Sequence, residues 1–135
     1  MESSIKIKQG QIDFTGLVLP YKSYVAILNQ TGTAAPTPTV IYNDLSGAIV
    51  WTYSSVGGYV GTLTGAFTES KTTCIIVNGQ AGSGLIGCNR VSDNVISLTT
   101  SNSTTAAPSN GMLFDATIEV RVYNSEEMLW KTLSK

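Results

Sequence analysis

The chain has 135 residues, of which 42% are hydrophobic and only 13% are charged, and its formal net charge is −1. This length suits one domain with a single core, and the combination of composition and low net charge excludes an intrinsically disordered chain. It also excludes a nucleic-acid-binding surface as the expected function, because neutralising phosphates requires clustered lysine and arginine side chains.

The chain begins "MESSIKIKQG", without the apolar run of a signal peptide behind a basic start. No window approaches the roughly 20 apolar residues that span a bilayer. We therefore expect a chain that folds in a cytoplasm and has no membrane partner. The two glycosylation-like triplets, at Asn29 and Asn102, are then interpreted as chance matches in a Thr-rich sequence.

Apolar and β-branched residues alternate with polar ones along most of the chain, and Gly, Pro, Asn or Ser interrupt each run. This pattern is typical of an all-β fold, and it predicts a single-domain antiparallel β-sandwich, jelly-roll-like in arrangement. The predicted strands are 4–8, 11–15, 23–30, 37–43, 48–54, 59–65, 72–78, 84–90, 94–100 and 112–124.

Three parts of the chain differ in pattern: an N-terminal arm (1–16), the β-sandwich domain (17–124) and a C-terminal tail (125–135). The arm alternates isoleucine with lysine, as an edge strand of its own domain or a strand that reaches a neighbouring subunit would do. The tail "SEEMLWKTLSK" is either a short helix or extended. The interface candidates in these two segments are Ile5, Ile7, Met128, Leu129, Trp130 and Leu133.

The segment 23–30 is apolar on both faces, since Tyr24, Ala26 and Leu28 point one way and Val25 and Ile27 the other. We expect it to be a central strand covered on both sides.

Residues that carry chemistry are scarce. Histidine is absent, which removes the usual general base and the commonest metal ligand. The Gly-rich run "GQAGSG" (79–84) lacks the lysine and hydroxyl residue of a phosphate-binding loop. The sequence therefore predicts no enzyme, with no catalytic, cofactor-binding or metal-binding residues and no cofactor.

Cys74 and Cys88 lie symmetrically about the turn-rich segment centred on Ala81. If 72–78 and 84–90 pair as a hairpin, the two cysteines face each other, and so do Ile76 and Ile86. Directly opposed residues come close enough for a disulfide at some pairs, and the alternative is two reduced thiols acting as small apolar groups.

The aromatic residues around the Gly57–Gly58 turn are the other candidates. A hairpin here brings Tyr53 close to Tyr59, and Trp51 is expected in the core. Tyr53 and Tyr59 are also the candidate ligand-contact residues if the domain stacks a sugar ring on exposed aromatics. The long polar run 99–111 is interpreted as an exposed hairpin loop, with a contact loop as the alternative.

The middle of the chain, roughly residues 21–72, carries a recognisable set of aromatic and turn residues: Tyr24-Val25-Ala26, Gln30, Ala35-Pro36, Asn43, Leu45, Gly47, Trp51, Gly58-Tyr59, Leu63 and Phe67. At these positions the chain resembles a short module found in tailed phages of Bacteroidetes, including crAss-like phages and their relatives. The chain has "YND" at 42–44 where the module has "ENT" or "NT". The resemblance implies a β-rich virion-associated module without an active site.

We therefore expect a phage virion structural protein that decorates the capsid or forms part of a head fibre, assembled in the host cytoplasm. Its expected partners are other virion proteins, such as the major capsid protein or fibre and portal-region proteins, and copies of itself in a dimer or trimer. The alternative is a phage-appendage module that binds host glycan or mucus.

Overall fold

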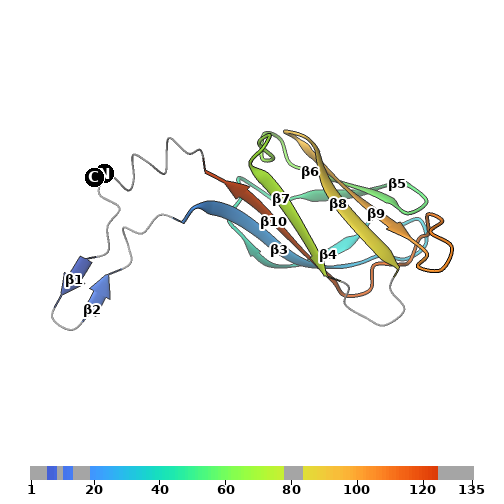
Figure 1. Ribbon diagram of the computed structural model, residues 1–135, viewed down its shortest axis with the longest axis horizontal. Helices are drawn as coiled ribbons and strands as arrows, with labels where there is room; N and C mark the ends of the chain where they lie inside the picture. The colour runs from blue at the N-terminus through green and yellow to red at the C-terminus, as the bar shows by residue number, and fades with distance from the viewer. Residues whose placement is uncertain (1–5, 9–10, 14–18, 78–83, 125–135) are drawn as a thin grey trace.

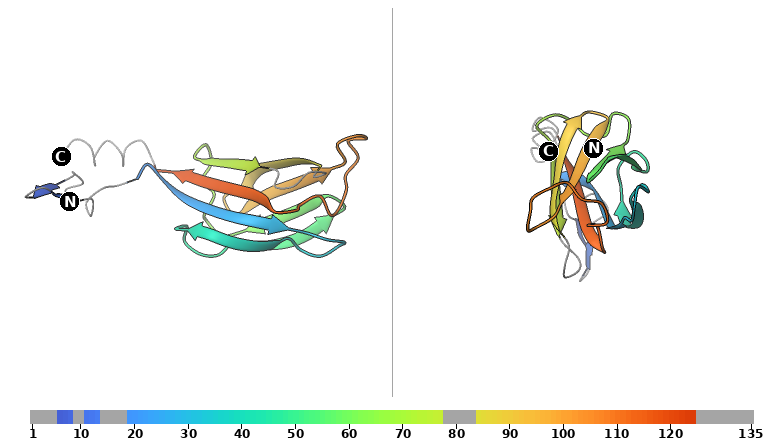
Figure 2. Two further views of the ribbon diagram at one scale, coloured as in Figure 1. Left: turned by 90° about the horizontal axis from the view of Figure 1, so that it is seen from below. Right: turned by 90° about the vertical axis from the view of Figure 1, so that its right-hand side faces the viewer.

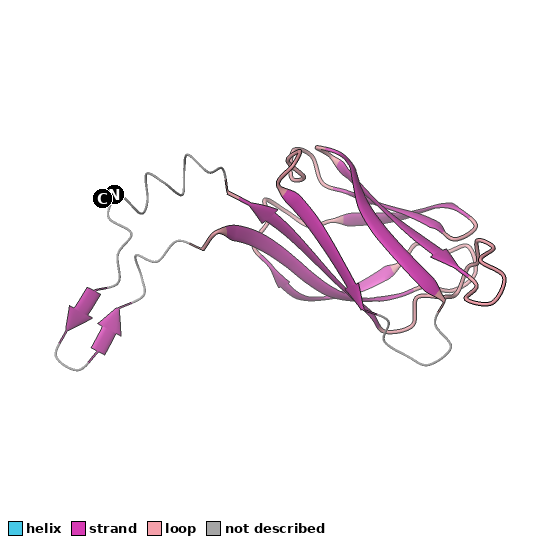
Figure 3. Ribbon diagram, in the orientation of Figure 1, coloured by secondary structure: helices cyan, strands magenta, loops and turns pink. Residues whose placement is uncertain are grey.

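The computed structural model describes residues 6–8, 11–13, 19–77 and 84–124, and in these residues the chain consists of strands and loops without a helix (Figure 3). Two four-stranded antiparallel sheets pack face to face (Figure 1). The predicted all-β sandwich is therefore confirmed. The strand order does not confirm a jelly-roll arrangement, and the helix considered for 125–135 lies outside the described residues.

The first sheet has the order β4-β3-β10-β7, and the second has the order β5-β6-β9-β8. The first comprises β3 (Tyr21–Asn29), β4 (Thr37–Asn43), β7 (Thr72–Val77) and β10 (Ala116–Tyr123). The second comprises β5 (Val50–Ser55), β6 (Gly58–Thr62), β8 (Leu85–Ser92) and β9 (Val95–Ser101). The chain crosses from one sheet to the other after β4, β6, β7 and β9. Both sheets are therefore needed to complete the fold.

The remaining strands, β1 (Lys6–Lys8) and β2 (Gln11–Asp13), pair with each other in a separate two-stranded sheet, with Ile7 opposite Ile12. The N-terminal arm therefore contributes no edge strand to either sheet of the sandwich in the part of the chain that is described, which corrects one of the two expectations for it.

The strand boundaries follow the sequence pattern closely except at the start of β10, which begins at Ala116 and not at 112. Asp115 has a φ of 50°, in the left-handed region, where an extended strand cannot continue. Its backbone N–H donates to Asn29 Oδ1 and its carboxylate accepts from Asn29 Nδ2, both at 2.9 Å. These bonds fix the turn that precedes the strand.

The core lies between the inner faces of the two sheets. From β3, Tyr24, Ala26 and Leu28 point inward and are fully buried, and Val120, Ile118 and Ala116 of β10 lie opposite them in register. The second sheet supplies the remaining strand residues of the core, Trp51, Tyr59, Ile96 and Leu98. The burial predicted for Trp51 is confirmed, and its Nε1 donates to Tyr24 Oη of the opposite sheet at 3.3 Å.

The central position predicted for the strand at 23–30 is also confirmed, because β3 lies between β4 and β10. Cover on both sides is wrong, however. Val25 and Ile27 on its outer face are only partly buried, since no further layer of the described residues packs over them. Figure 2 shows the sandwich from two further directions, with the outer face of the first sheet uncovered over β3 and β10.

One buried polar side chain, Gln30, organises an end of the sandwich. It is 3% exposed, and its Oε1 accepts from Tyr59 Oη and from the Gly111 backbone N–H, both at 2.7 Å. Its Nε2 lies within hydrogen-bonding distance of the carbonyls of Thr31 (3.2 Å), Gly32 (2.8 Å) and Ala34 (3.0 Å). The amide thus joins β6, the β3–β4 loop and the loop before β10.

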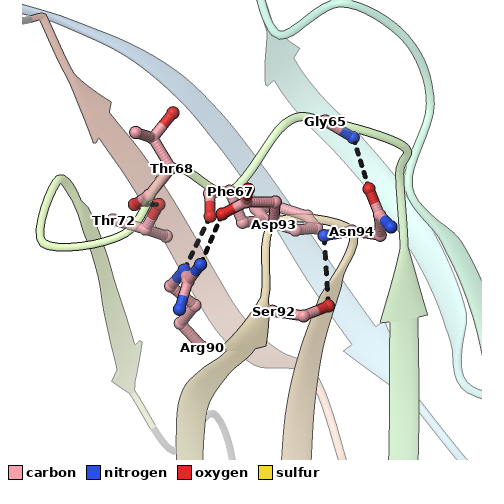
Figure 4. Close-up of polar contacts among 8 residues, drawn as sticks. All are labelled: Gly65, Phe67, Thr68, Thr72, Arg90, Ser92, Asp93 and Asn94. Carbon is pink, nitrogen blue, oxygen red and sulfur yellow. Dashed lines mark hydrogen bonds and ion pairs between the residues drawn. The ribbon is translucent and has the colours of Figure 1, made fainter.

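At the opposite end of the sandwich, a second set of polar side chains, Arg90, Asp93 and Asn94, holds the β6–β7 loop and the β8–β9 turn together (Figure 4). The β8–β9 hairpin carries Arg90, whose Nε donates to the Phe67 carbonyl at 2.7 Å while its Nη2 pairs with Asp93. Asn94 Oδ1 accepts from the Gly65 backbone N–H at 2.8 Å. These side chains satisfy backbone groups of the β6–β7 loop, whose buried Phe67 completes the core.

Truncation of Trp51 tests the core. We expect Trp51→Ala to lower the free energy of unfolding by about 3–5 kcal/mol, because it leaves a large cavity between the sheets and deprives Tyr24 of a hydrogen-bond partner. Urea unfolding measures the change, with the exposed Val50→Ala as a control that should shift stability by less than about 0.5 kcal/mol. A Trp51→Ala variant as stable as the wild type would contradict this description of the core.

Removal of the Gln30 side chain tests the loop organisation. Gln30→Ala leaves Tyr59 Oη and the Gly111 N–H without their acceptor, so we expect a loss of about 3 kcal/mol or more. The control is Asn89→Ala, which removes a side-chain amide that bonds to Ser97 on the exposed outer face of the second sheet. If both variants lose equally little stability in urea, Gln30 does not have the organising role described.

Candidate interaction surface

The outer face of the second sheet is polar across its middle and nearly free of charge, and its exposed apolar residues, Val50, Leu85 and Val91, lie on the two edge strands. Across its middle, Thr52, Val60, Ser97 and Asn89 follow one another on the four strands in register. The neighbouring row runs through Gly58, Thr99 and Gly87. Small polar residues on one face of an antiparallel sheet are the usual pattern for a face in contact with water.

The outer face of the first sheet departs from that pattern. One row across the four strands contains Tyr42, Val25, Glu119 and Ile75, and the next contains Thr39, Ile27, Thr117 and Val77. Large apolar side chains are exposed at three of these positions: Tyr42 (49%), Ile75 (42%) and Val77 (58%). We call the set Val25, Ile27, Tyr42, Ile75 and Val77 the apolar face.

The charged residues that accompany the apolar face neutralise each other. Arg121 and Glu119 form an ion pair, with Arg121 Nε 2.6 Å from Glu119 Oε2. The Arg121 guanidinium also lies over the ring of Tyr21, 4.7 Å from its centroid, and Tyr21 packs on Tyr123 at a centroid distance of 5.1 Å. This face therefore presents rings and aliphatic groups around an internally paired charge.

The edge of the same sheet is apolar as well. Edge strand β4 carries no charge, and its Val40 and Ile41 are 49% and 61% exposed. Val25 pairs with Tyr42 and Ala26 with Val40, so Ile41 is the extra residue of a β-bulge. Native edge strands are commonly protected by charges, proline or bulges, and β4 has Pro38 and the bulge but no charge.

The described residues offer little chemistry elsewhere. No group of three His, Cys, Asp or Glu side chains among them could hold a metal ion. A cavity of about 170 Å³ is lined by Lys22, Leu45, Ser46, Gly65, Ala66 and Val122. This volume is below that of typical small-molecule sites, and the lining contains one charged group, Lys22. In the same part of the chain, no helix is long and apolar enough to cross a membrane.

The tyrosines singled out as ligand contacts occupy different environments. Their predicted cross-strand pairing is confirmed, with Tyr53 opposite Tyr59 and ring centroids 6.0 Å apart. Tyr59 is only 1% exposed, however, and burial raises the pKa of its hydroxyl. It cannot stack on a ligand, because both its ring and its hydroxyl are used inside the sandwich. Tyr53 is half-buried, and its hydroxyl accepts from Asn110 Nδ2 at 3.2 Å.

Of the predicted interface residues in the N-terminal arm and the C-terminal tail, the structure describes only one. Ile7 lies in β1, whereas Ile5, Met128, Leu129, Trp130 and Leu133 are outside the described residues. Within the run 99–111, Asn102 Oδ1 caps a tight turn by accepting from the backbone N–H groups of Thr104 and Thr105. The residues from 103 to 108 are all exposed, as expected for a surface loop. The predicted hairpin is wrong, because β9 extends to Ser101 and the chain then crosses to β10 of the other sheet.

The hairpin predicted for the two cysteine-containing strands is wrong. β7 pairs with β10 and β8 pairs with β9, so Cys74 and Cys88 belong to different sheets. The turn-rich sequence between them resembled a hairpin loop, but it connects strands across the edge of the sandwich. The two cysteines are therefore not a cross-strand pair of one sheet, but they are neighbours, because β7 and β8 are adjacent edge strands and Cys88 is the main influence on the pKa of Cys74.

The sequence pattern did not single out the residues of the apolar face as a group. Val25 and Ile27 were assigned to a buried second face, and Ile75, Val77 and Tyr42 come from strands far apart in the sequence. The sequence signal that could have found them is the alternation in 72–77. Ile75 and Val77 point to one side of this strand, and Cys74 and Ile76 point to the other.

Comparison of the chain with protein families, curated proteins and solved structures found no match in any of the three. The geometry of the surface and the resemblance described from the sequence are therefore the grounds for a functional proposal.

Proposed function

We propose that this protein is a non-catalytic structural subunit of a phage particle, decorating the capsid or forming part of a head fibre. It would pack against neighbouring subunits through the apolar face of its first sheet. The phage resemblance of residues 21–72 suggests the particle, and the apolar face is the observation that supports the manner of assembly.

The contrast between the two outer faces supports this proposal. Across its middle the second sheet presents Thr52, Ser97, Thr99 and Asn89 to water, and its exposed apolar side chains, Val50, Leu85 and Val91, lie apart from one another on the edge strands β5 and β8, whereas the first sheet presents Tyr42, Ile75 and Val77. Apolar side chains grouped on a sheet face, rather than scattered singly, mark an interaction surface. The first sheet, with Val25 and Ile27 between its exposed apolar side chains on β4 and β7, is therefore the face that we propose for a partner.

The pairing of charges on the first sheet also supports assembly through the apolar face. Interface cores are depleted in charged residues because a buried unpaired charge is strongly destabilising. Glu119 and Arg121 are already paired within the subunit, and Arg121 is stacked on Tyr21. Covering this face would therefore leave neither charge without a partner. We take a second copy of this chain as the first neighbour to test, with other virion proteins as further partners.

A lysine on the apolar face tests the proposal. We expect Val77→Lys to weaken self-association at least tenfold, because a buried ammonium group without an anion costs more than the 1.4 kcal/mol that corresponds to that factor. Sedimentation velocity over a range of protein concentrations measures the association. Val91→Lys is the matched control, since Val91 is 57% exposed and Val77 is 58% exposed.

The same two variants should then be compared in purified particles by mass spectrometry. Reduced incorporation of Val77→Lys, with normal incorporation of Val91→Lys, would support the particle role. If Val77→Lys folds, associates and enters particles like the wild type, the proposed use of this face is wrong. If the wild-type protein is missing from purified particles, the virion assignment itself fails.

Binding of a host surface glycan is a second candidate, supported by one observation. Tyr42 is 49% exposed on the apolar face, and the Tyr21–Tyr123 pair lies on the same face of the sheet. The hydrogen bond from its hydroxyl to Asp44 raises the pKa of Tyr42 and helps to hold the side chain in place. Flat exposed rings of this kind can stack on the apolar face of a sugar.

A glycan array distinguishes this second candidate. If it is correct, the wild-type protein binds at least one glycan and Tyr42→Ala loses most of that binding, because the exposed ring is the stacking surface. Tyr53→Ala should bind like the wild type, since the Tyr53 hydroxyl is engaged with Asn110 and its ring packs on Tyr59. No glycan hit, or equal loss in both variants, would count against it.

A further inference from the structure

Cys74 and Cys88 meet across the edge of the sandwich where the two sheets come together. β7 and β8 are edge strands of different sheets and lie side by side (Figure 1). Cys74 is opposite the buried Val120 in register, and Cys88 is opposite the buried Leu98, so both thiols point toward the interior. There each thiol is the main influence on the pKa of the other, so the two side chains are neighbours.

Both cysteines lie at the margin of the core. Each is reduced and intermediate in exposure, packed against the core and not enclosed within it. Ile76 and Ile86, the next inward-facing residues along β7 and β8, are likewise partly buried against the core. The pair is therefore nearer to solvent than the fully buried residues between the sheets.

We propose that Cys74 and Cys88 form an intersheet disulfide when the folded chain meets a low-molecular-weight disulfide such as oxidised glutathione. The site would be reduced in a reducing compartment and bonded in an oxidising one. This inference rests on the two strands and their thiols, and it does not depend on the proposed function.

The reaction is an ordinary thiol–disulfide exchange in two steps. The thiolate of one cysteine attacks one sulfur of oxidised glutathione, forms a mixed disulfide and releases one glutathione thiolate. The thiolate of the other cysteine then attacks the protein sulfur of the mixed disulfide and releases the second glutathione thiolate. The two protons from the cysteines end on the two glutathione molecules. The protein loses two electrons, and glutathione disulfide gains them.

The two thiols influence each other's ionisation. The interaction with Cys88 lowers the pKa of Cys74, because a thiolate at Cys74 is stabilised by its neighbour. The same interaction, with burial, raises the pKa of Cys88. One thiol of the pair therefore ionises more easily than the other, and the second attacks once the first has been consumed in the mixed disulfide.

The bond would restrain the fold where no backbone ladder does. β7 and β8 are not hydrogen-bonded to each other as neighbours in one sheet, so no backbone ladder joins them at this edge. A disulfide here closes a loop of about 15 residues and reduces the conformational entropy of the unfolded chain. The expected consequence is a higher melting temperature, by roughly 5–15 °C for a domain of this size.

The test uses the folded wild-type protein, incubated with oxidised glutathione and then denatured for thiol titration and intact mass measurement. We expect both free thiols to be lost, the mass to fall by two hydrogen atoms, and the melting temperature to rise and return to its initial value with reductant. Cys74→Ser and Cys88→Ser are matched controls. Each should give only a mixed disulfide with glutathione and no rise in melting temperature.

Three results would overturn the proposal. The thiols could remain free after prolonged incubation, or they could form only mixed disulfides or bonds between two chains. The intramolecular bond could also form without raising the melting temperature. Because all three are read on the wild-type chain, the test does not depend on either serine variant folding. Its result is also separate from that of the particle-incorporation experiment.

Discussion

The end of the sandwich around Gln30 depends on one buried amide. A two-sheet fold in which four connections change sheet must hold its loops at fixed positions, or the sheets can slide past each other. Gln30 does this by joining the end of β3 to Tyr59 of the other sheet and to Gly111 before β10. Its backbone N–H also donates to the Leu113 carbonyl at 3.0 Å, which places the buried Leu113 side chain. Few side chains other than glutamine carry both an acceptor and a donor at this distance from the backbone. Because both groups of the Gln30 amide are hydrogen-bonded, the chain tolerates a buried polar group here.

The glycines next to this network show how closely it is fitted. Gly57 has a φ of 66°, and a Cβ there would lie 2.2 Å from the Thr100 carbonyl oxygen. Its N–H donates to Asn110 Oδ1 at 2.8 Å, one residue before the Gly111 N–H that Gln30 binds. The β5–β6 turn, the end of β9 and the loop before β10 are therefore packed backbone against backbone. The exposed part of the 99–111 loop projects from a base that is itself rigid.

The sequence was informative where structure is local and uninformative where it depends on distant partners. Alternation and turn residues located the strands, and the Gly57–Gly58 turn gave the correct Tyr53–Tyr59 pair because the two strands are adjacent in the chain. The insertion of β10 between β3 and β7 joins segments about 90 and 45 residues apart, and no local pattern encodes that register. The apolar face is built from this pairing, so it could not be predicted. The cysteine hairpin failed for the same reason, since a turn-rich connection does not reveal whether it stays within one sheet.

β7 combines the two surfaces from which the functional proposals arise. Its inward residues, Cys74 and Ile76, pack at the junction of the sheets, and its outward residues, Ile75 and Val77, lie on the apolar face. As an edge strand it is hydrogen-bonded to one neighbour, β10, and is thus less restrained than β3. A disulfide from Cys74 to β8 would restrain β7 from its inner side without altering the groups on its outer side. For the particle subunit that we propose, a disulfide formed after release from a reducing compartment would stabilise the sandwich and leave the contacts of the apolar face unchanged.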